Sequence, residues 1–339
     1  MLKPYIQKVI NQQDLTVEEA QEAMNIIMDG AATDAQIGGY LVGLRMKGET
    51  VPEITGSARA MRAHAAPIKV DFNGDALLDT AGTGGDGAHT FNISTAAAFV
   101  IAGTGHKVAK HGNRAASSKC GSADVLAELG VNLDLTPEQV GQCIDEIGIG
   151  FLFAPSFHTA MKHAIGPRRE LGQRTIFYLL GPLTNPAGAT HQVIGVFDPS
   201  LTQPMAEVLG KLGGRAALVV HGYGGLDELT TAGPNRVSHL KDGVVNTYQI
   251  DAADFDLQPA AADDLRGGDP QENAYMLRKL LSGEDKSPRR DVVLLNAAAA
   301  LASEDGDFQT ALAQARQSID SNAAISKLDH LITLSQSFS

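Results

Sequence analysis

The sequence LLDTAGTGGDGAHTFNIST, residues 77–95, decides the fold of this chain. An apolar run ends in an acidic residue, four glycines follow within six residues, and Asn-x-Ser-Thr then opens an Ala-rich run at 96–102. This order predicts a strand, a glycine loop and the N-terminus of a helix. The bare N–H groups of such a loop and the positive end of the helix both attract anions. The stretch is therefore typical of a phosphate-binding site.

The composition narrows the class of protein. The 339 residues, 43% hydrophobic and 19% charged, suffice for two or more globular domains. A net charge of −12 and the absence of Trp argue against nucleic-acid binding, which needs a basic face and stacking aromatics. The two cysteines form no Cys-x-x-Cys pair, so we expect no zinc site and a reducing compartment. Without a signal pattern or a long apolar run, we expect a cytoplasmic protein that does not contact membranes.

The spacing of apolar residues predicts helices throughout residues 1–66. Thr16, Thr33 and Thr50 are each followed three residues later by Glu or Gln, which is the capping-box pattern of a helix start. Gly48 lies where a helix C-terminus is expected. So small a bundle buries little apolar surface alone. We therefore expect it to pack on later helices or on a second subunit.

After residue 75, short apolar strands alternate with helices, as in α/β domains with a mostly parallel sheet. We expect strands at 76–80, 106–110, 149–153, 192–197, 216–221 and about 292–295. We expect helices at 96–102, 123–129, 137–147, 271–282, 291–303 and 307–319, two helices within 156–180, and a polar surface loop at 249–270. The predicted class is α/β, with a small all-helical domain of residues 1–70 plus about 157–186 and a large α/β domain of residues 71–156 plus 187–339.

The glycine loop also matches Gly-x-Gly-x-x-Gly at Gly82, Gly84 and Gly87, the pattern of dinucleotide-binding folds. Such a site needs an acidic residue at the end of the next strand, about 20 residues on. Here that strand ends in the basic segment KHGNR, residues 110–114. The dinucleotide alternative is therefore disfavoured. Asp86 within the loop suggests that a metal ion or ribose hydroxyls lie nearby.

Two further groups are expected at the same edge of the sheet. Residues 110–114 precede a second loop and a helix start, and neighbouring parallel strands end at one crevice. Asp227 and Glu228 follow the strand at 216–221, and paired carboxylates suit a hard cation such as Mg²⁺. Each feature alone is commonly a solvated loop. Beside the glycine loop they predict a site for two phosphate groups some distance apart.

The middle helices carry a histidine and an arginine whose roles the local sequence leaves open. His158 is near apolar residues, where a histidine usually serves packing. Arg168 follows Gly166-Pro167, and its side chain either binds an acidic substrate through paired hydrogen bonds or lies on the surface.

Together these segments resemble the anthranilate phosphoribosyltransferases, which are nucleoside-phosphorylase-like (class III) phosphoribosyltransferases. The resemblance covers almost the whole chain and rests on GTGGDG (82–87), NIST (92–95), KHGNR (110–114), CGSADVL (120–126), GPLTNP (181–186) and LDE (226–228). It implies a small helical domain, a large phosphoribosyl-binding α/β domain and a homodimer formed through the helical domain. It also implies transfer of 5-phosphoribosyl from phosphoribosyl pyrophosphate (PRPP) to the amino group of anthranilate, with loss of pyrophosphate, in tryptophan synthesis.

The resemblance implies roles for three groups of residues. PRPP would be bound by Gly82, Thr83, Gly84, Gly85, Asp86, Thr90, Asn92, Ser94, Thr95, Lys110, Asn113 and Ser122. Anthranilate would contact Gly82, His111, Asn113, His158 and Arg168, with Arg168 facing its carboxylate. Two Mg²⁺ ions would be bound by Ser94, Asp227 and Glu228. Lys110 would stabilise the leaving pyrophosphate, and His111 is the nearest candidate base, although alignment of the amine suffices without one.

Two positions depart from the family pattern. Tyr178 stands where the family usually has Asn, and Gly224-Gly225 stands where Asp-Gly is frequent.

Two alternative functions stay open, that of a pyrimidine nucleoside phosphorylase of the same fold and that of a non-catalytic relative that binds nucleic acid. Substrates held by two domains imply hinge closure, with expected hinges near 67–73 and 185–190.

Overall fold

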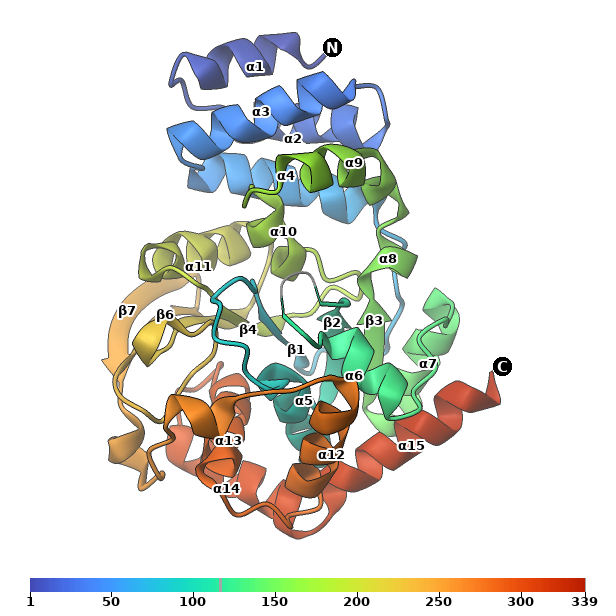
Figure 1. Cartoon of the computed structure of the whole chain (residues 1–339), viewed down its shortest axis with the longest axis vertical. Helices are drawn as coiled ribbons and strands as arrows, with labels where there is room; N and C mark the ends of the chain where they lie inside the picture. Colours follow the sequence, from blue (N-terminus) through green and yellow to red (C-terminus); the bar gives the residue numbers. More distant parts are fainter. Residues whose placement is uncertain (116–117, 339) are drawn as a thin grey trace.

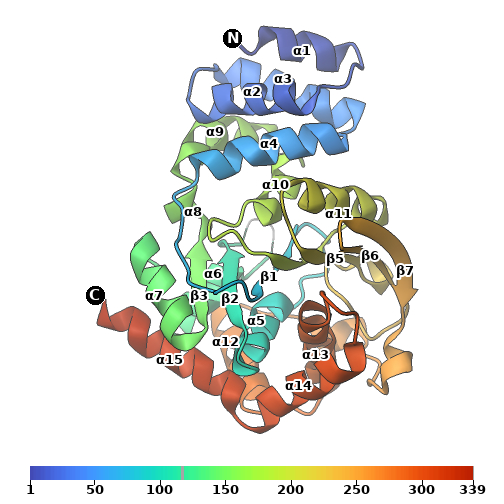
Figure 2. The same ribbon diagram turned by 180° about the vertical axis from the view of Figure 1, so that it is seen from behind.

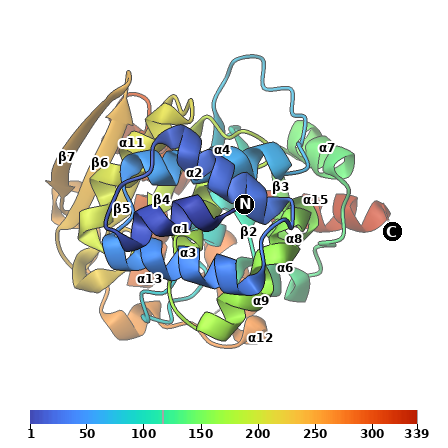
Figure 3. The same ribbon diagram turned by 90° about the horizontal axis from the view of Figure 1, so that it is seen from above.

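The structure is a computed structural model and describes residues 1–115 and 118–338. A layer of helices at one end of the molecule is stacked on a larger body built around a β-sheet (Figure 1). The layer consists of α1 (Lys3–Ile10), α2 (Val17–Met28), α3 (Asp34–Lys47), α4 (Val51–His64) and α9 (Lys162–Leu171). Seen from above, α1 lies outermost (Figure 3). The helix α9 comes from the middle of the chain and packs on α3 and α2.

In the described part of the chain, the body contains a seven-stranded sheet with the order β3-β2-β1-β4-β5-β6-β7. The strands are β1 (Leu77–Gly82), β2 (Lys107–Gly112), β3 (Ile149–Phe153), β4 (His191–Gly195), β5 (Ala216–His221), β6 (Asn235–Lys241) and β7 (Val244–Ile250). The first five pair in parallel, and β6 and β7 are antiparallel to their neighbours. The predicted fold class, a helical part plus an α/β part with a mostly parallel sheet, is confirmed.

The remaining helices cover the sheet (Figure 2). They are α5 (Ile93–Gly103), α6 (Ser122–Glu128), α7 (Pro137–Ile147), α8 (Ala154–Phe157), α10 (Phe177–Leu183), α11 (Thr202–Lys211), α12 (Pro270–Leu281), α13 (Pro288–Leu301), α14 (Phe308–Asp320) and α15 (Ala323–Ser337). The helix α5 follows the glycine loop and is the central one, because α12, α13, α14 and α15 all pack against it. The glycine loop is therefore attached to the most buried helix of the body.

Two apolar cores lie on opposite faces of the sheet. Val193 and Leu218 belong to the core that contains α5, whereas Ile194 and Val219, their neighbours in sequence, belong to the other. This alternation is the two-residue period of β-strands. The second core also contains apolar residues of α2, α3, α4, α10 and α11. The helical layer thus shares one continuous core with a face of the sheet.

Several predictions of secondary structure are corrected. The strand predicted at 292–295 is wrong, because these residues lie within α13. The run Val292 to Ala300 is buried throughout, so it carries no period that separates helix from strand. The pair β6 and β7 was not predicted, although Asp242 and Gly243, both with positive φ, form the Asp-Gly turn typical of a hairpin.

The stretch at 156–180, predicted to hold two helices, is divided further. It contains the end of α8, a 3₁₀ turn at Thr159–Met161, α9 and the start of α10. Gly181 and Pro182 lie inside α10, which begins at Phe177 and ends at Leu183, one residue after the proline. The loop predicted at 249–270 begins with the end of β7 and contains two 3₁₀ turns, Ala252–Phe255 and Ala262–Leu265.

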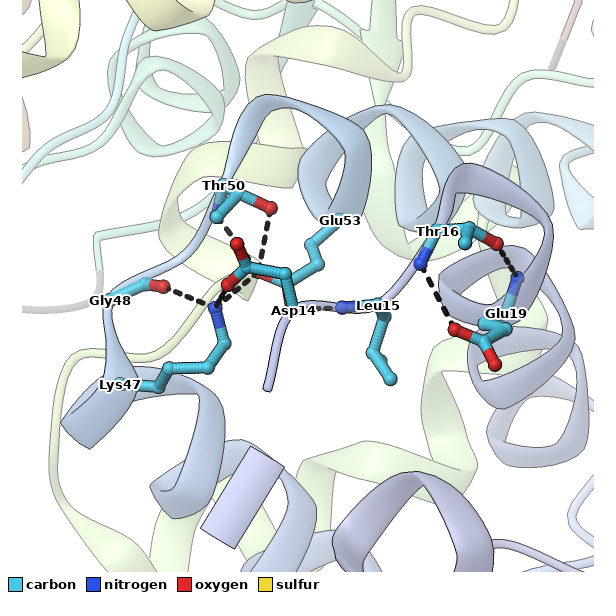
Figure 4. Close-up of polar contacts among 8 residues, drawn as sticks. All are labelled: Asp14, Leu15, Thr16, Glu19, Lys47, Gly48, Thr50 and Glu53. Carbon is cyan, nitrogen blue, oxygen red and sulfur yellow. Dashed lines mark hydrogen bonds and ion pairs between the residues drawn. The ribbon is translucent and has the colours of Figure 1, made fainter. Parts of the chain in front are cut away.

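A buried ion pair joins the helix connections of the helical layer (Figure 4). The Glu53 carboxylate is fully buried and accepts hydrogen bonds from Lys47 Nζ at 2.9 Å, from the Leu15 N–H at 3.0 Å and from the Thr50 N–H at 2.9 Å. Lys47 Nζ also donates to Asp14 Oδ1 at 2.7 Å. One carboxylate therefore fixes the start of α4 to the loop between α1 and α2.

We expect Glu53→Ala to lower the free energy of unfolding by about 3 kcal/mol, because it leaves the buried Lys47 charge and two backbone N–H groups without this partner. Glu18→Ala, on the exposed first turn of α2, serves as the control and should cost less than about 0.5 kcal/mol. Chemical denaturation followed by far-UV circular dichroism measures both. Equal stability of the two variants would contradict a structural role for Glu53.

Candidate active site

Loops after β1, β2 and β5 meet at the carboxyl edge of the sheet around a cavity of about 500 Å³. The two helix starts nearest to it belong to α5 and α6. The cavity is lined by every residue that the sequence suggested for PRPP and Mg²⁺, namely Gly82, Thr83, Gly84, Gly85, Asp86, Thr90, Asn92, Ser94, Thr95, Lys110, Asn113, Ser122, Asp227 and Glu228. Residues 116 and 117 of the second loop lie outside the described residues. We call this space the polar cavity.

A second cavity of about 310 Å³ opens between the helical layer and the sheet. His111, Asn113, His158 and Arg168, the residues suggested for anthranilate, line it together with apolar side chains such as Met61 and Phe177. We call it the apolar cavity. His111 and Asn113 also line the polar cavity, so the two spaces meet at these two residues. Gly82 lines only the polar cavity.

The glycine loop is held closely against Asp227. The N–H of Gly84 donates to Asp227 Oδ2 at 2.6 Å, and the Asp227 N–H donates to Asp86 Oδ2 at 3.4 Å. A Cβ added at Gly82 would come within 2.3 Å of Asp227 Oδ2, and Gly84 has a φ of +71°, which favours glycine. The glycines therefore serve a close approach of the loop to a carboxylate.

Burial disfavours the charged forms of the two carboxylates at the end of this cavity, Asp227 and Glu228. Burial, together with the charges of Glu228 and Asp86, raises the pKa of Asp227. Burial also raises the pKa of Glu228 to about 7, against the opposing effect of Lys110, and Glu228 Oε1 accepts a hydrogen bond from the Ser94 N–H at 3.1 Å. Such a group of oxygen donors suits a divalent cation. Among the described residues no three acidic, imidazole or thiol groups converge on one metal position, so other ligands must complete a shell here.

Lys110 and His111 are positioned by a buried carboxylate to which sequence analysis assigned no role. Asp79 accepts hydrogen bonds from the His111 N–H at 3.1 Å and from Asn185 Nδ2 at 2.9 Å. Its charge, with that of Glu228, acts to raise the pKa of Lys110, while burial acts more strongly and lowers it. Lys110 Nζ donates to the Thr80 carbonyl at 2.5 Å. The sequence signal available for Asp79 was an acidic residue directly after an apolar run.

The two histidines between the cavities form a neutral pair. Their ring centroids are 5.1 Å apart, and burial lowers the pKa of His111 to about 3 and that of His158 to about 4. Each ring hydrogen-bonds a backbone carbonyl, that of Gly181 or Thr184, while neither buried Nε2 has a partner among the described residues. Two neutral imidazoles therefore offer unused nitrogen atoms, that of His111 where the cavities meet and that of His158 in the apolar cavity.

Arg168 and Thr95 also have unused polar groups. The Arg168 guanidinium lies 4.8 Å from the Phe177 ring centroid and forms no ion pair within the described ranges. The Thr95 hydroxyl is buried on the first turn of α5 and has no hydrogen-bond partner in the same part of the chain. Arg168 is thus free for an acid in the apolar cavity, and Thr95 for an acceptor in the polar cavity.

The polar cavity also contains residues that sequence reasoning missed or left open. Arg174 lines it and donates a hydrogen bond to the Gly85 carbonyl. Tyr178 lines the same cavity. Arg114 pairs with Asp124 at 3.0 Å. An arginine in a short polar link has no local pattern that marks it, so only the fold reveals Arg174.

Comparison with known proteins gives this arrangement a class. Residues 3–65 match the family described as "Glycosyl transferase family, helical bundle domain", and residues 74–325 match "Glycosyl transferase family, a/b domain". The helical layer, the parallel sheet and the polar cavity at its carboxyl edge are therefore those of a two-part glycosyl transferase.

Relatives define the family within that class. The anthranilate phosphoribosyltransferase of Symbiobacterium thermophilum is 54% identical over 332 residues, which cover 97% of this chain and 96% of that protein. The crystal structure of the Thermus thermophilus enzyme of the same name has a TM-score of 0.93 and 45% identity, covering 98% of this chain and 99% of that one. The Saccharomyces cerevisiae enzyme in complex with PRPP and Mg has a TM-score of 0.90 and 28% identity, covering 99% and 98%. The chain belongs to the anthranilate phosphoribosyltransferase family.

Proposed function

We infer that this chain transfers the 5-phosphoribosyl group from PRPP to the amino group of anthranilate and releases pyrophosphate, a step of tryptophan synthesis. It is a pentosyltransferase, as its full-length relatives are. The observation that carries the inference is the meeting of two cavities of different chemistry. The polar cavity contains loop N–H groups, carboxylates and a lysine, and the mostly apolar cavity contains the free Arg168. The two cavities meet at His111 and Asn113.

PRPP fits the polar cavity through the residues named for it above. Its diphosphate would accept hydrogen bonds from the glycine loop and from the N-terminus of α5, whose N–H groups attract anions. The unpartnered Thr95 hydroxyl and Ser122 offer further donors. The ribose C1 would then lie toward His111 and Asn113, where the apolar cavity begins.

Asp227, Glu228 and Ser94 would hold Mg²⁺, for which the crowded carboxylates supply the oxygen donors. We propose two ions, with diphosphate oxygens completing their coordination. Bound there, Mg²⁺ supplies positive charge that stabilises a leaving pyrophosphate. Lys110 would add charge from the protein itself, because its Nζ is fixed at the cavity wall by the Thr80 carbonyl.

Anthranilate fits the apolar cavity, with its carboxylate on Arg168 and its ring among Met61, His158 and Phe177. The neutral His111 offers an Nε2 acceptor to the amino group. Because a pKa of about 3 makes His111 a weak base, we propose that it orients the amine rather than removing its proton before attack. Asn113 lines both cavities and completes the contacts in the apolar one, and Gly82 would approach anthranilate from the polar cavity, which it lines.

The acidic limb of the pH profile should come from Glu228. Its carboxyl is protonated below its pKa of about 7 and cannot then bind Mg²⁺, whereas His111 does not change charge above about pH 4. We expect kcat/KM for PRPP, which reports the free enzyme, to fall about tenfold per pH unit below about pH 7. Glu228→Gln should change the position of this limb, because it removes the titration of Glu228 and leaves those of PRPP and of Asp227, whose pKa the Glu228 charge helps to raise. A wild-type profile identical to that of Glu228→Gln would contradict the assignment.

We further propose a division into a small helical domain, residues 1–70 plus about 157–186, and a large phosphoribosyl-binding domain, residues 71–156 plus 187–339. Ile10 and Met46 of α1 and α3, exposed by 54% and 77%, support a homodimer formed through the helical domain. Sedimentation should then give twice the chain mass of 35.6 kDa.

No described helix is long and apolar enough to cross a membrane. We propose a cytoplasmic location and no nucleic-acid partner.

The activity is tested by the fluorescence of anthranilate. The fluorescence should disappear only when PRPP and Mg²⁺ are both present. Phosphorolysis of thymidine or uridine would instead identify a pyrimidine nucleoside phosphorylase, and tight salt-sensitive DNA binding without turnover would identify a non-catalytic relative. Unchanged fluorescence at high protein concentration would exclude the proposed function.

A further inference from the structure

The polar cavity contains a cation that the reaction scheme above does not use. Arg174 lies in the short link between α9 and α10 and faces the glycine loop from the side of the helical layer. Its guanidinium donates to the Gly85 carbonyl, and a Cβ added at Gly85 would lie 3.2 Å from Arg174 Nε. Arg174 therefore touches the loop to which the diphosphate is assigned above.

The other cations of the polar cavity are already engaged. Lys110 is buried beside Asp79 and Glu228, and Arg114 pairs with Asp124 at 3.0 Å. Within residues 1–115 and 118–338, Arg174 forms no ion pair. A guanidinium has five N–H donors, and the one acceptor described for it is a single carbonyl. Arg174 therefore has both charge and donors to offer a ligand.

The guanidinium is also held in place before any ligand arrives. It lies over the ring of Phe197, 4.5 Å from its centroid, just beyond the end of β4. Stacking on an aromatic ring and a hydrogen bond to Gly85 restrict a side chain that is otherwise flexible. A planar guanidinium fixed in this way binds phosphate oxygens in pairs at little further cost in conformational entropy.

We propose that Arg174 binds the diphosphate of PRPP and the pyrophosphate released from it. The proposal rests on the function proposed above and adds a residue to it. Negative charge on the diphosphate grows as the bond to ribose C1 breaks, so a cation at the glycine loop stabilises the leaving group. Because Arg174 belongs to the α9–α10 segment, its contact with the diphosphate also connects that segment to the glycine loop when substrate is bound.

Calorimetric titration of the full chain with magnesium pyrophosphate and with magnesium PRPP, in the absence of anthranilate, tests the proposal. Arg174→Gln keeps a side-chain N–H for the Gly85 carbonyl and removes the charge, whereas Arg174→Lys keeps the charge. We expect Arg174→Gln to weaken both ligands about tenfold or more, because hydrogen bonds to charged groups are the stronger ones. We expect Arg174→Lys to recover part of the loss, because lysine keeps the charge and loses the planar pair of donors. Binding of ribose 5-phosphate, which has no diphosphate, should change less than about twofold in either variant.

Arg169→Gln is the matched control, since Arg169 is an exposed arginine of α9 and does not line the polar cavity. It should bind pyrophosphate like the unaltered chain. Unchanged pyrophosphate binding by Arg174→Gln would overturn the proposal. An equal loss in Arg174→Gln and Arg174→Lys would also overturn it, by showing that loop geometry and not charge is responsible. If the unaltered chain binds neither PRPP nor pyrophosphate, the proposed function fails instead.

Discussion

Replacing Asp227 by Asn should lower kcat/KM for PRPP about a thousandfold, which corresponds to about 4 kcal/mol of lost stabilisation. The amide has nearly the shape of the carboxylate, and its oxygen can still accept the Gly84 N–H that Asp227 Oδ2 accepts at 2.6 Å. What it removes is the negative charge toward Mg²⁺. Steady-state kinetics at several Mg²⁺ concentrations measure the effect, and the apparent Mg²⁺ requirement should rise with it.

The stability of the same variant separates a metal-binding role from a structural one. Burial and the charges of Glu228 and Asp86 oppose ionisation of Asp227 and raise its pKa, so neutralising it relieves repulsion. In the absence of ligands, Tm should stay equal or rise. Asp242→Asn, in the exposed β6–β7 turn, removes one charge far from the site and should leave the kinetics unchanged. A lower Tm with normal Mg²⁺ dependence would contradict the assignment of Asp227.

Replacing Arg168 by Ala should raise KM for anthranilate about thirtyfold, because a charged hydrogen-bonding pair contributes about 2 kcal/mol. The guanidinium lines the apolar cavity and lies over Phe177, so its loss affects the acceptor and not the diphosphate. The KM for PRPP should therefore change little. Arg168→Lys should have a KM for anthranilate between those of the unaltered chain and Arg168→Ala, since it keeps the charge and loses the planar pair of donors.

The fluorescence assay that follows anthranilate measures these constants directly. Arg169→Ala removes the adjacent exposed arginine and should retain the unaltered KM. Benzoate derivatives without the amino group should also bind less tightly to Arg168→Ala as competitive inhibitors, which reports binding without turnover. An unchanged anthranilate KM would remove Arg168 from the acceptor site.

Local signals in the sequence predicted much of the fold. Thr16 and Thr33 begin helices with complete capping boxes because the pattern is itself a set of hydrogen bonds within four residues. The parallel strands and their loops followed from short apolar runs between helices. The β6–β7 pair was missed although Asp242-Gly243 marked it, and Val292 to Leu295 was ambiguous because a fully buried helix and a buried strand share the same composition.

The candidate site was predictable where residues follow strand ends and unpredictable where distant segments meet. Asp86 and Asp227 lie 141 positions apart, yet each follows a strand of one sheet, so topology predicted their approach. The contact of Arg174 with Gly85 spans 89 positions and joins a link between helices to a loop, with no strand end to indicate it. Asp79 was hidden because its partners, the His111 N–H and Asn185, are defined only by the folded chain.

His111 and Asn113 form a wall common to two cavities, and this has a consequence for inhibitor design. We expect a single compound with a phosphorylated group at one end and a benzoate at the other to bind in both cavities, with its linker beside these two residues. Its second end binds at an effective concentration in the millimolar range, set by the length and stiffness of the linker. Two fragments with weak individual affinities would thus combine into one tight inhibitor, and the optimal linker length would measure the separation of the two subsites in solution.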